Sequence, residues 1–422
     1  MARLLYTLLL WLILPFIFLR LAWRAQRQPE YLRDVGERFG SYAARASTRP
    51  VLWLHAVSVG ETRAAQPLVR ELSMQYPGHD LVLTCMTPTG RAAAHDIYAG
   101  EARITIAYLP YDYPYAVRRF LRHFRPVLGL IMETEIWPNL VAGCNQAGVP
   151  LALVNARLSA RSAAGYARIA ALARPAFAGL TRVTAQSEED RARLVASGAR
   201  AVEVTGNLKF DVAAPPQLVE RGQAWRAARG GRAMLLAAST REGEEVLLLD
   251  ALAPLLRQGV LLAIVPRHPQ RFDEVARLIE ARGHVLGRRS HGETVAADVQ
   301  VWLGDSMGEM PAYYAAADCA YVGGSLLPFG GQNLIEACAL GCPVLIGPHT
   351  YNFAQAAELA VVAGAARRVA DAAQLAAEAA RLLEDAPARG RMADAGIAFA
   401  QAHRGATQRT LQMIAGLLPA PT

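Results

Sequence analysis

Cysteine is scarce in this sequence and poorly placed for metal binding. The 422 residues include five cysteines, an odd number without a C-x-x-C pair, at Cys85, Cys144, Cys319, Cys338 and Cys342. Four of them lie in apolar stretches, where cysteine usually packs as a small hydrophobic residue. The sequence therefore offers no convincing metal-ligand cluster, and it favours a reduced, cytoplasmic protein body.

Charged residues are also scarce. They make up 19% of the chain against 53% hydrophobic residues, and the net charge is +8 at pH 7. This basic balance favours an acidic partner: a nucleic acid, an anionic lipid surface or a phosphorylated substrate. No nucleic-acid-binding motif is present and the arginines are dispersed, so we expect no nucleic acid. A chain of this length is expected to form two or three domains.

The N-terminus carries a long apolar run. Residues 4–19 are almost uninterrupted apolar sequence, close to the roughly 17–20 residues that a membrane-spanning helix needs. Pro15 would kink such a helix, which membrane helices tolerate. Arg3 precedes the run, whereas five arginines follow it: Arg20, Arg24, Arg27, Arg33 and Arg38. The positive-inside rule therefore predicts a single-pass membrane anchor with the rest of the chain in the cytoplasm.

Two alternatives for this segment stay open. A cleaved signal peptide would need small residues after the apolar run, but the sequence from Arg20 to Arg24 is RLAWR. A helix lying in the plane of the membrane interface fits the same composition. With either a spanning or an in-plane helix, the protein body lies at the inner face of a membrane.

Short apolar runs alternate with alanine-rich helical stretches after this segment. Continuous hydrophobicity is typical of strands in a parallel sheet that is covered on both faces. The first series of expected strands is Val51–Leu54, Leu81–Thr84, Ile104–Ala107, Val127–Ile131, Leu151–Val154 and Val202–Val204. The second series is Met234–Ala238, Leu261–Val265, Val299–Leu303, Cys319–Val322 and Val344–Ile346. Two such series predict an α/β protein with twin Rossmann-like domains whose parallel sheets face across a ligand-binding cleft.

The expected domain boundaries follow from breaks in this pattern. It weakens between Phe210 and Gly231, where Pro215 and Pro216 indicate a connection. We expect a membrane anchor over 1–27, an N-terminal domain over 28–212, a linker over 213–231 and a C-terminal domain over 232–422. Alanine-rich helices from about 372 to 418 complete the C-terminal domain.

The most informative stretch is the glycine-rich segment from Tyr321 to Pro348. It predicts a strand, a loop with glycines at 323, 324, 330 and 331, and a helix that opens near Gln332. Glycine lets the backbone approach a ligand, and a helix start offers free N–H groups to an anion. Asn333 and Glu336 lie three residues apart, so both can face one ligand and hydrogen-bond sugar or ribose hydroxyls. The alternative is an ordinary α/β loop with capping residues.

A second loop, HAVSVGE at 55–61, follows the first expected strand. Gly60 indicates a tight turn, and Glu61 falls in the first turn of the next helix, where the helix N-terminus stabilises a carboxylate. In the functional interpretation, Glu61 is a general base that projects into the cleft. In the structural interpretation, its carboxylate only interacts favourably with the helix N-terminus. His55 is more often a core histidine at a strand end than a catalytic group.

Two carboxylates follow the fourth expected strand. Glu133 and Glu135 belong to the segment METEIWPN at 132–139. Carboxylates at a buried strand end are costly unless something pairs with them, and Lys209, in GNLKFD after another strand, is a candidate partner. The alternative is a structural ion pair that ties the strand ends together.

Two further strand ends carry groups suited to a nucleotide. Arg267 and His268 leave a strand of the second series, and a bidentate guanidinium suits a phosphate. Gly308, Glu309 and Met310 precede a helix whose free N–H groups suit a base or ribose. Both segments predict nucleotide contacts in the C-terminal domain.

Together these motifs closely resemble those of the 3-deoxy-D-manno-octulosonic acid (Kdo) transferases of lipopolysaccharide assembly, which are two-domain GT-B glycosyltransferases. The resemblance covers essentially the whole chain. Its most specific motifs are HAVSVGE at 55–61, METEIWPN at 132–139, NLKFD at 207–211, PRHP at 266–269, GEM at 308–310 and GGQNLIE at 330–336. The resemblance implies an inner-membrane enzyme that transfers Kdo from CMP-Kdo to the lipid A precursor (lipid IVA), with an acceptor-binding N-terminal domain and a donor-binding C-terminal domain.

The resemblance also assigns roles position by position. Glu61 matches the catalytic base, and Glu133 and Lys209 match residues that stabilise the transition state, with Glu135 as an alternative to Glu133. The CMP-binding positions are Arg267, His268, Gly308, Glu309, Met310, Asn333, Leu334, Ile335 and Glu336. The segment ASTREGE at 238–244 is similar to a donor-side loop of the family. Direct displacement on one face implies an inverting reaction that needs no metal ion and no cofactor besides the donor.

Three other functions fit parts of the sequence. A glycosyltransferase with a UDP-sugar donor would share the fold and the nucleotide site. A non-hydrolysing sugar epimerase shares the twin-domain design but would not need a membrane anchor. A non-catalytic binding module is expected to lack Glu61 or Lys209, and both are present.

Arginines repeat at three-to-four spacing at positions 118, 119, 122 and 125, so several should share one helical face. We hypothesise that this face contacts anionic lipid headgroups or the phosphates of the substrate. The alternative is a plain solvated helix surface.

Overall fold

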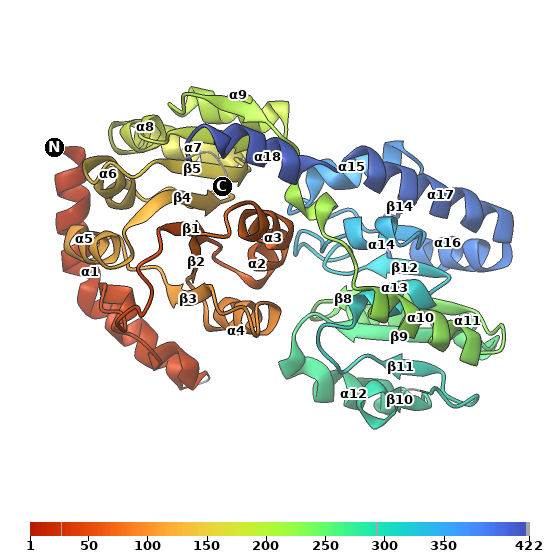
Figure 1. The fold of residues 1–422 in the computed structure, drawn as a ribbon. Helices are drawn as coiled ribbons and strands as arrows, with labels where there is room; N and C mark the ends of the chain where they lie inside the picture. The colour runs from red at the N-terminus through yellow and green to blue at the C-terminus, as the bar shows by residue number, and fades with distance from the viewer. Residues whose placement is uncertain (27, 293, 419–422) are drawn as a thin grey trace. The chain divides into compact units, whose positions relative to one another are not determined.

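The chain forms two α/β units in a computed structural model that describes residues 1–26, 28–292 and 294–418 (Figure 1). The first unit comprises residues 1–212 together with the segment from residue 404 onward, and the second comprises Ala213–His403. Each unit has its own parallel sheet and its own helices.

The first unit is built on a seven-stranded sheet in the order β3-β2-β1-β4-β5-β6-β7, with every neighbouring pair parallel. Its strands are β1 (Val51–His55), β2 (Asp80–Cys85), β3 (Ile104–Tyr108), β4 (Pro126–Met132), β5 (Leu151–Ala156), β6 (Arg182–Ala185) and β7 (Val202–Val204). Alternate residues of β1 point to opposite faces, so that Val51 and Trp53 join one buried core while Leu52 and Leu54 join another. Burial on both faces explains why the strand is continuously apolar.

Helices cover both faces of this sheet. They are α1 (Ala2–Ala25), α2 (Val59–Ala64), α3 (Gln66–Gln75), α4 (Pro88–Ile97), α5 (Pro114–Phe124), α6 (Pro138–Gln146), α7 (Ala160–Arg168), α8 (Ala170–Ala178), α9 (Glu188–Ala196) and α18 (Ala406–Ala415), with short 3-10 helices η1 (Pro29–Leu32), η2 (Glu37–Phe39) and η3 (Leu208–Asp211). Among the described residues, α1 alone is long and apolar enough to cross a membrane.

The second unit repeats this architecture with the strand order β10-β11-β9-β8-β12-β13-β14, again with parallel neighbours. Its strands are β8 (Met234–Thr240), β9 (Leu261–Pro266), β10 (Leu286–Arg288), β11 (Val301–Leu303), β12 (Cys319–Val322), β13 (Val344–Ile346) and β14 (Ala366–Arg368). Its helices are α10 (Pro216–Ala228), α11 (Glu244–Arg257), η4 (Pro269–Arg271), α12 (Phe272–Ala281), η5 (Arg289–His291), α13 (Met310–Ala316), α14 (Ile335–Ala339), α15 (Ala354–Val362), α16 (Ala372–Glu384) and α17 (Ala386–Ala402).

The expected fold class, an α/β protein with two parallel sheets and an apolar N-terminal helix, is confirmed. The search for apolar runs misses β6, β10 and β14. These strands have three or four residues and each includes arginine, so they present almost no apolar run. Both β10 and β14 are edge strands, where one side of the strand has no partner in the sheet.

The linker expected over 213–231 differs from the structure. Most of it is α10, a helix of the second unit that packs closely on α13. A Cβ atom at Gly222 would lie 2.2 Å from the carbonyl oxygen of Ala312, so only glycine permits this approach. The two prolines that indicated a connection instead mark the start of the helix, since proline is favoured in the first turn.

The expected C-terminal domain also differs, because α18 belongs to the first unit. The carboxylate of Asp211 accepts hydrogen bonds from the amides of Gly405 and Thr407 at 2.7 and 2.6 Å, and so caps the start of α18. Arg409 donates to the carbonyl oxygen of Thr205 at 2.8 Å. These contacts join segments about 200 residues apart in the chain, which local sequence patterns do not reveal.

Candidate active site

Glu61 lies in the first turn of α2, directly after β1. Its carboxylate accepts hydrogen bonds from the Val57 amide at 2.9 Å and from the Ser58 hydroxyl at 3.1 Å. Ser58 in turn caps the helix by accepting from the Glu61 amide at 3.4 Å. This reciprocal arrangement resembles a capping box, so the expected structural role of Glu61 is present and fixes the position of its carboxylate.

The same surroundings change the acidity of Glu61. Burial, followed by the negative charge of Glu133, raises the pKa of Glu61 from 4.5 to about 7, although the hydrogen bonds from Val57 and Ser58 oppose this rise. A carboxylate with a pKa near neutrality is a stronger base than an ordinary glutamate and still ionises at physiological pH. Glu61 is therefore suited to accept a proton.

The two carboxylates after β4 have different partners. Glu133 lies at the strand end with a φ of 58°, a left-handed conformation that is rare for residues other than glycine. Its carboxylate lies 2.9 Å from the ammonium group of Lys209 on η3. Glu135 instead accepts a hydrogen bond from the indole N–H of Trp137 at 2.7 Å. The geometry thus distinguishes Glu133 as the partner of Lys209.

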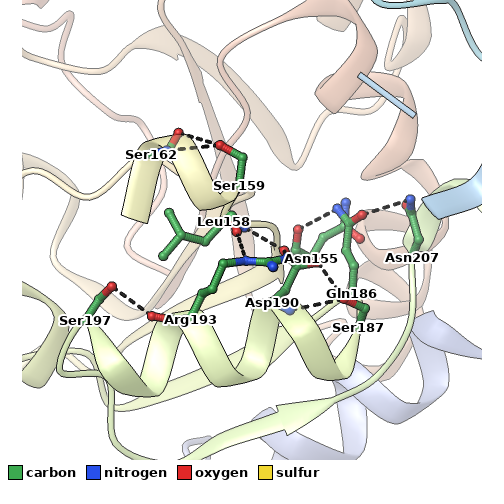
Figure 2. Close-up of polar contacts among 10 residues, drawn as sticks. All are labelled: Asn155, Leu158, Ser159, Ser162, Gln186, Ser187, Asp190, Arg193, Ser197 and Asn207. Carbon is green, nitrogen blue, oxygen red and sulfur yellow. Dashed lines mark hydrogen bonds and ion pairs between the residues drawn. The ribbon is translucent and has the colours of Figure 1, made fainter. Parts of the chain in front are cut away.

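A polar network holds the loop that carries Lys209 (Figure 2). The Asn207 amide donates to the side-chain oxygen of Gln186 at 3.1 Å, and the Gln186 amide donates to the backbone oxygen of Asn155 at 2.9 Å. The Asn155 side-chain oxygen accepts from the Leu208 amide at 3.0 Å. Asn155 is fully buried and adopts a φ of 53°. Residues from the ends of β5, β6 and β7 therefore position the lysine.

Sequence reasoning missed Asn155 and Gln186. The criterion used for Glu133, a polar side chain directly after an expected strand, applies to Asn155, which follows the expected strand Leu151–Val154. It does not reach Gln186, because the strand before it, β6, was not expected. A second signal is that Lys209 is the only lysine in a sequence of 422 residues, in which arginine provides every other basic side chain apart from histidine.

His55 is a core residue, as expected for a histidine at a strand end. Its ring is fully buried, and Nδ1 lies 3.0 Å from the carbonyl oxygen of Thr84. Burial lowers the pKa of His55 to about 3, so the ring is neutral at physiological pH.

In the second unit, Arg267 and His268 follow β9 within a group of arginines. Burial, and then the positive charges of Arg241, Arg267 and Arg271, lower the pKa of His268. Arg267 also donates to the side-chain oxygen of Gln332 at 3.3 Å, which links it to the glycine-rich loop. The cluster is therefore electropositive and suited to a phosphate.

Buried Glu244 holds the first part of that loop. Its carboxylate accepts hydrogen bonds from the amides of Gly324 at 2.7 Å and Leu326 at 3.1 Å, and from the Tyr321 hydroxyl at 2.6 Å. At Gly323 a Cβ atom would lie 2.6 Å from the backbone oxygen of Ser239. The loop is thus fixed by a buried carboxylate and a close backbone approach.

The helix after the glycine-rich loop begins later than expected. It starts at Ile335 and not near Gln332, because the Asn333 side chain accepts a hydrogen bond from the Ile335 amide at 3.1 Å. Leu334 and Ile335 are 1% and 2% exposed. Their side chains belong to the core, so a ligand can contact these two residues only through the backbone.

Glu309 uses its side chain within the protein. The carboxylate pairs with Arg221 at 2.6 Å and with Arg289 at 2.9 Å, and it accepts from the Ser306 hydroxyl. Although burial raises it, the hydrogen bonds from Ser306 and Arg289 bring the pKa of Glu309 below its usual value. Gly308 precedes it with a φ of 82°. These contacts engage the Glu309 side chain within the protein and fix the backbone around it.

The described residues contain no group of three or more histidine, cysteine, aspartate or glutamate side chains placed to hold a metal ion. The five cysteines are all buried and unpaired.

Comparison with known proteins shows that the chain is a glycosyltransferase. A family model for 3-deoxy-D-manno-octulosonic-acid transferase matches residues 33–212, and one for group 1 glycosyl transferases matches residues 248–399. The 3-deoxy-D-manno-octulosonic acid transferase of Bordetella pertussis is 47% identical over 427 residues, covering 98% of this chain and 99% of the relative. That of Haemophilus influenzae is 36% identical over 421 residues, covering 98% of both. The chain belongs to the Kdo transferase family.

The fold extends to more distant proteins. A UDP-GlcNAc 2-epimerase from Neisseria meningitidis, solved with UDP-GlcNAc, superposes with a TM-score of 0.60 over 87% of this chain and 100% of that one, at 15% identity. At this identity the likeness shows the fold alone. The resemblance of the motifs to Kdo transferases is confirmed by the closer relatives.

Proposed function

We propose that this Kdo transferase uses CMP-Kdo as donor and the lipid A precursor (lipid IVA) as acceptor. Membership of the family supports the transferred sugar. The observation that carries the chemical proposal is the carboxylate of Glu61, whose pKa is raised to about 7 beside the ion pair of Glu133 and Lys209.

Glu61 acts as the general base in this proposal. It accepts the proton of the attacking acceptor hydroxyl while the new C–O bond forms at the anomeric carbon of Kdo. The bond between this carbon and the phosphate oxygen breaks, and CMP leaves with the electron pair. Attack and departure on opposite faces invert the anomeric centre. A positioned base contributes roughly 10²–10⁴-fold to such a step.

Glu133 and Lys209 stabilise the transition state. The ammonium group of Lys209 pairs with the Glu133 carboxylate, and the negative charge of Glu133 helps to keep the pKa of Glu61 high. The positive charge of Lys209 also suits the carboxylate of Kdo. The strained backbone of Glu133 is consistent with a functional position, since such conformations persist where the surrounding structure enforces them.

The second unit binds the donor in this proposal. Arg267 and His268 meet the phosphate of CMP, where a guanidinium offsets the charge that develops on the leaving group. The backbone of 308–310 and the segment from Asn333 to Glu336 contact the nucleoside. The fixed conformation of both loops supports this assignment, because preorganised donors need no rearrangement during the reaction.

The membrane association of the enzyme follows from α1. The helix is apolar enough to enter a bilayer, and the acceptor of the proposed reaction is a lipid. We infer that the protein body lies on the cytoplasmic side of the inner membrane, because arginines follow the apolar run 4–19 of α1.

The test of this function is Kdo transfer from CMP-Kdo to purified lipid A precursor by the full-length wild type and by Glu61→Gln. Glutamine can still accept the hydrogen bond from Val57, so the variant should fold. Glu101→Gln, an exposed carboxylate in a loop, is the matched control. Product with the wild type and the control, with loss in Glu61→Gln, is the expected result. A folded wild type that forms no product and is protected by UDP but not by CMP would indicate a different donor.

A further inference from the structure

The N-terminal helix α1 lies lengthwise along the first unit. Its less exposed residues recur at intervals of three and four, which is the spacing of one helical face. They are Ala2, Tyr6, Thr7, Leu10, Leu14, Ile17, Leu21, Arg24 and Ala25. The helix contacts α6 and α8, and Figure 1 shows it running along this flank of the first unit (red). One face of α1 is therefore covered by protein along most of its length.

Polar contacts fix the N-terminal half of the helix. The Asn139 amide, at the start of α6, donates to the Thr7 hydroxyl at 3.0 Å. The Tyr113 hydroxyl donates to the backbone oxygen of Leu10 at 2.6 Å. These bonds join side chains of the globular unit to α1 itself, so the helix is docked on the unit.

Further contacts fix the other half. The ring of Phe18 stacks on Phe39, with centroids 5.3 Å apart, and Arg24 donates to the Tyr31 hydroxyl at 3.4 Å. Contacts from Thr7 to Arg24 cover about 25 Å of helix at a rise of 1.5 Å per residue. This length is close to the hydrocarbon thickness of a bilayer, about 30 Å.

The rest of the helix surface is exposed and apolar. No charged residue occurs between Arg3 and Arg20. The exposed large side chains are Leu4, Leu5, Leu8, Leu9, Trp11, Leu12, Ile13, Phe16, Phe18, Leu19 and Trp23, of which Trp11 and Phe18 also stack on rings of the first unit. A continuous apolar surface of this length is unusual on a soluble protein and indicates contact with lipid.

A helix perpendicular to the membrane would carry its covering protein into the hydrocarbon. The cover includes the start of α6, where Asp112 accepts from the amides of Asn139 and Leu140 at 3.0 and 2.7 Å. It also includes α5, whose Tyr115 stacks on Trp11 with centroids 5.6 Å apart. The exposed arginines of α5 would then lie at the depth of the acyl chains, where charged groups are strongly disfavoured.

Basic side chains flank both ends of α1 on the same unit. A cavity of about 450 Å³ between the ends of α5 and α6 is lined by Arg118, Arg122 and Arg125. A neighbouring cavity that shares one lining residue with it is bordered by Arg3. Arg20 and Arg24 lie at the other end of the helix. A spanning helix would place these two groups at opposite leaflets, whereas a helix parallel to the membrane places both at one surface.

We propose that α1 lies in the plane of the membrane, between the first unit and one leaflet of an anionic phospholipid bilayer. The exposed apolar residues enter the boundary between headgroups and acyl chains, and Arg118 and Arg122 contact headgroup phosphates. The anchor expected to span the membrane is then an interfacial one. In-plane docking would hold the first unit at a constant height above the surface from which a lipid acceptor is drawn.

Depth measurements on the full-length protein test this placement. Single cysteines at Leu5→Cys, Leu12→Cys and Leu19→Cys lie on one exposed face of α1, two turns apart, and the native cysteines are buried. Each variant carries a nitroxide label in vesicles of phosphatidylethanolamine and phosphatidylglycerol. Collisions with oxygen and with a water-soluble nickel complex report the depth of the label. Substrate is not required, so the result is independent of the proposed reaction.

The in-plane helix predicts similar depths for all three labels, about 5–10 Å below the phosphates. A spanning helix would separate the first and last labels by about 21 Å along the membrane normal, with the middle label deepest. That result would overturn the proposal, and so would three labels exposed to water. Val195→Cys, exposed on α9, is the control for a label outside the membrane.

Vesicle binding tests the proposed contact of Arg118 and Arg122 with headgroup phosphates. Arg118→Gln with Arg122→Gln should weaken binding to the same vesicles by about fivefold per arginine at low salt, and less at high salt. Arg191→Gln with Arg200→Gln removes the same charge from another exposed part of the unit and should have little effect. Equal binding of both double variants would refute the headgroup contact, while labels at equal depth would retain the in-plane helix.

Discussion

Glu61→Gln should lower activity and raise stability at the same time. The substitution removes the proposed base, so transfer should fall by roughly 10²–10⁴-fold. It also removes a carboxylate that is costly to ionise in the folded protein. The hydrogen bond from Val57 at 2.9 Å can be kept by the glutamine oxygen, so the start of α2 should persist.

The size of the stability effect follows from the acidity of Glu61. Burial and the charge of Glu133 raise its pKa in the folded state from 4.5 to about 7, which corresponds to about 3 kcal/mol. Because the folded pKa lies above the unfolded one, this cost is absent below pH 4.5, grows as the pH rises and is complete above pH 7. Glu61→Gln should therefore be more stable than the wild type at pH 8 and nearly equal to it at pH 4.5.

The same pKa predicts the pH profile of the wild type. With a pKa of about 7, the ionised fraction of Glu61 rises from about 3% at pH 5.5 to about 90% at pH 8. The transfer rate should increase about thirty-fold over this range and then level off. Glu133→Gln removes the neighbouring negative charge and should lower the pKa of Glu61. The increase in its residual activity with pH should therefore occur at a lower pH than in the wild type.

Initial rates of Kdo transfer and urea unfolding at several pH values measure these effects. Glu101→Gln, which changes an exposed carboxylate, should match the wild type in both assays. The reasoning is refuted if Glu61→Gln keeps its activity. It is also refuted if the variant is no more stable than the wild type at pH 8, since the raised pKa would then be absent.

Three other substitutions test the supporting structure. Lys209→Gln should leave Glu133 without its ammonium partner and lower the free energy of unfolding by about 1–3 kcal/mol. Most of the transfer activity should be lost, while thermal protection by CMP should stay unchanged. Glu244→Ala should leave the amides of the glycine-rich loop and the Tyr321 hydroxyl unsatisfied, lowering stability by about 3 kcal/mol or more and weakening protection by CMP, with Glu244→Gln less severe. Asp211→Ala should remove the two hydrogen bonds at the start of α18 and lower the free energy of unfolding in urea by about 1–3 kcal/mol. Thermal protection by CMP should stay unchanged, and its loss would contradict the assignment of α18 to the first unit.

The fold class and much of the candidate site were predictable because both depend on short stretches of sequence. Strands buried on both faces must be continuously apolar, so most of them appear as apolar runs. In a parallel sheet the carboxyl ends of the strands lie along one edge, so polar residues directly after strands are expected to gather there. Glu61, Glu133 and Lys209 were found by this rule. The arginine-bearing strands β6 and β14 were not, because their hydrophobic pattern is too short.

Partners distant in the sequence were decided only by the tertiary structure. Glu133 pairs with Lys209, 76 residues away, while Glu135, two residues from Glu133, turns to Trp137. Both residues are glutamates after the same strand, so the sequence does not show which of them pairs with Lys209. The positions of β4 and η3 in the fold decide this.

The N-terminal helix shows the same division. Its sequence alone determined that it is helical and apolar enough to enter a membrane, because both properties depend on residues in the segment itself. Its sequence does not contain the protein surface that covers one of its faces. The tertiary structure supplies that surface through Asn139 and Tyr113, which bond to α1 from other parts of the chain. The orientation of a helix depends on what lies beside it, and those neighbours are brought together only by folding.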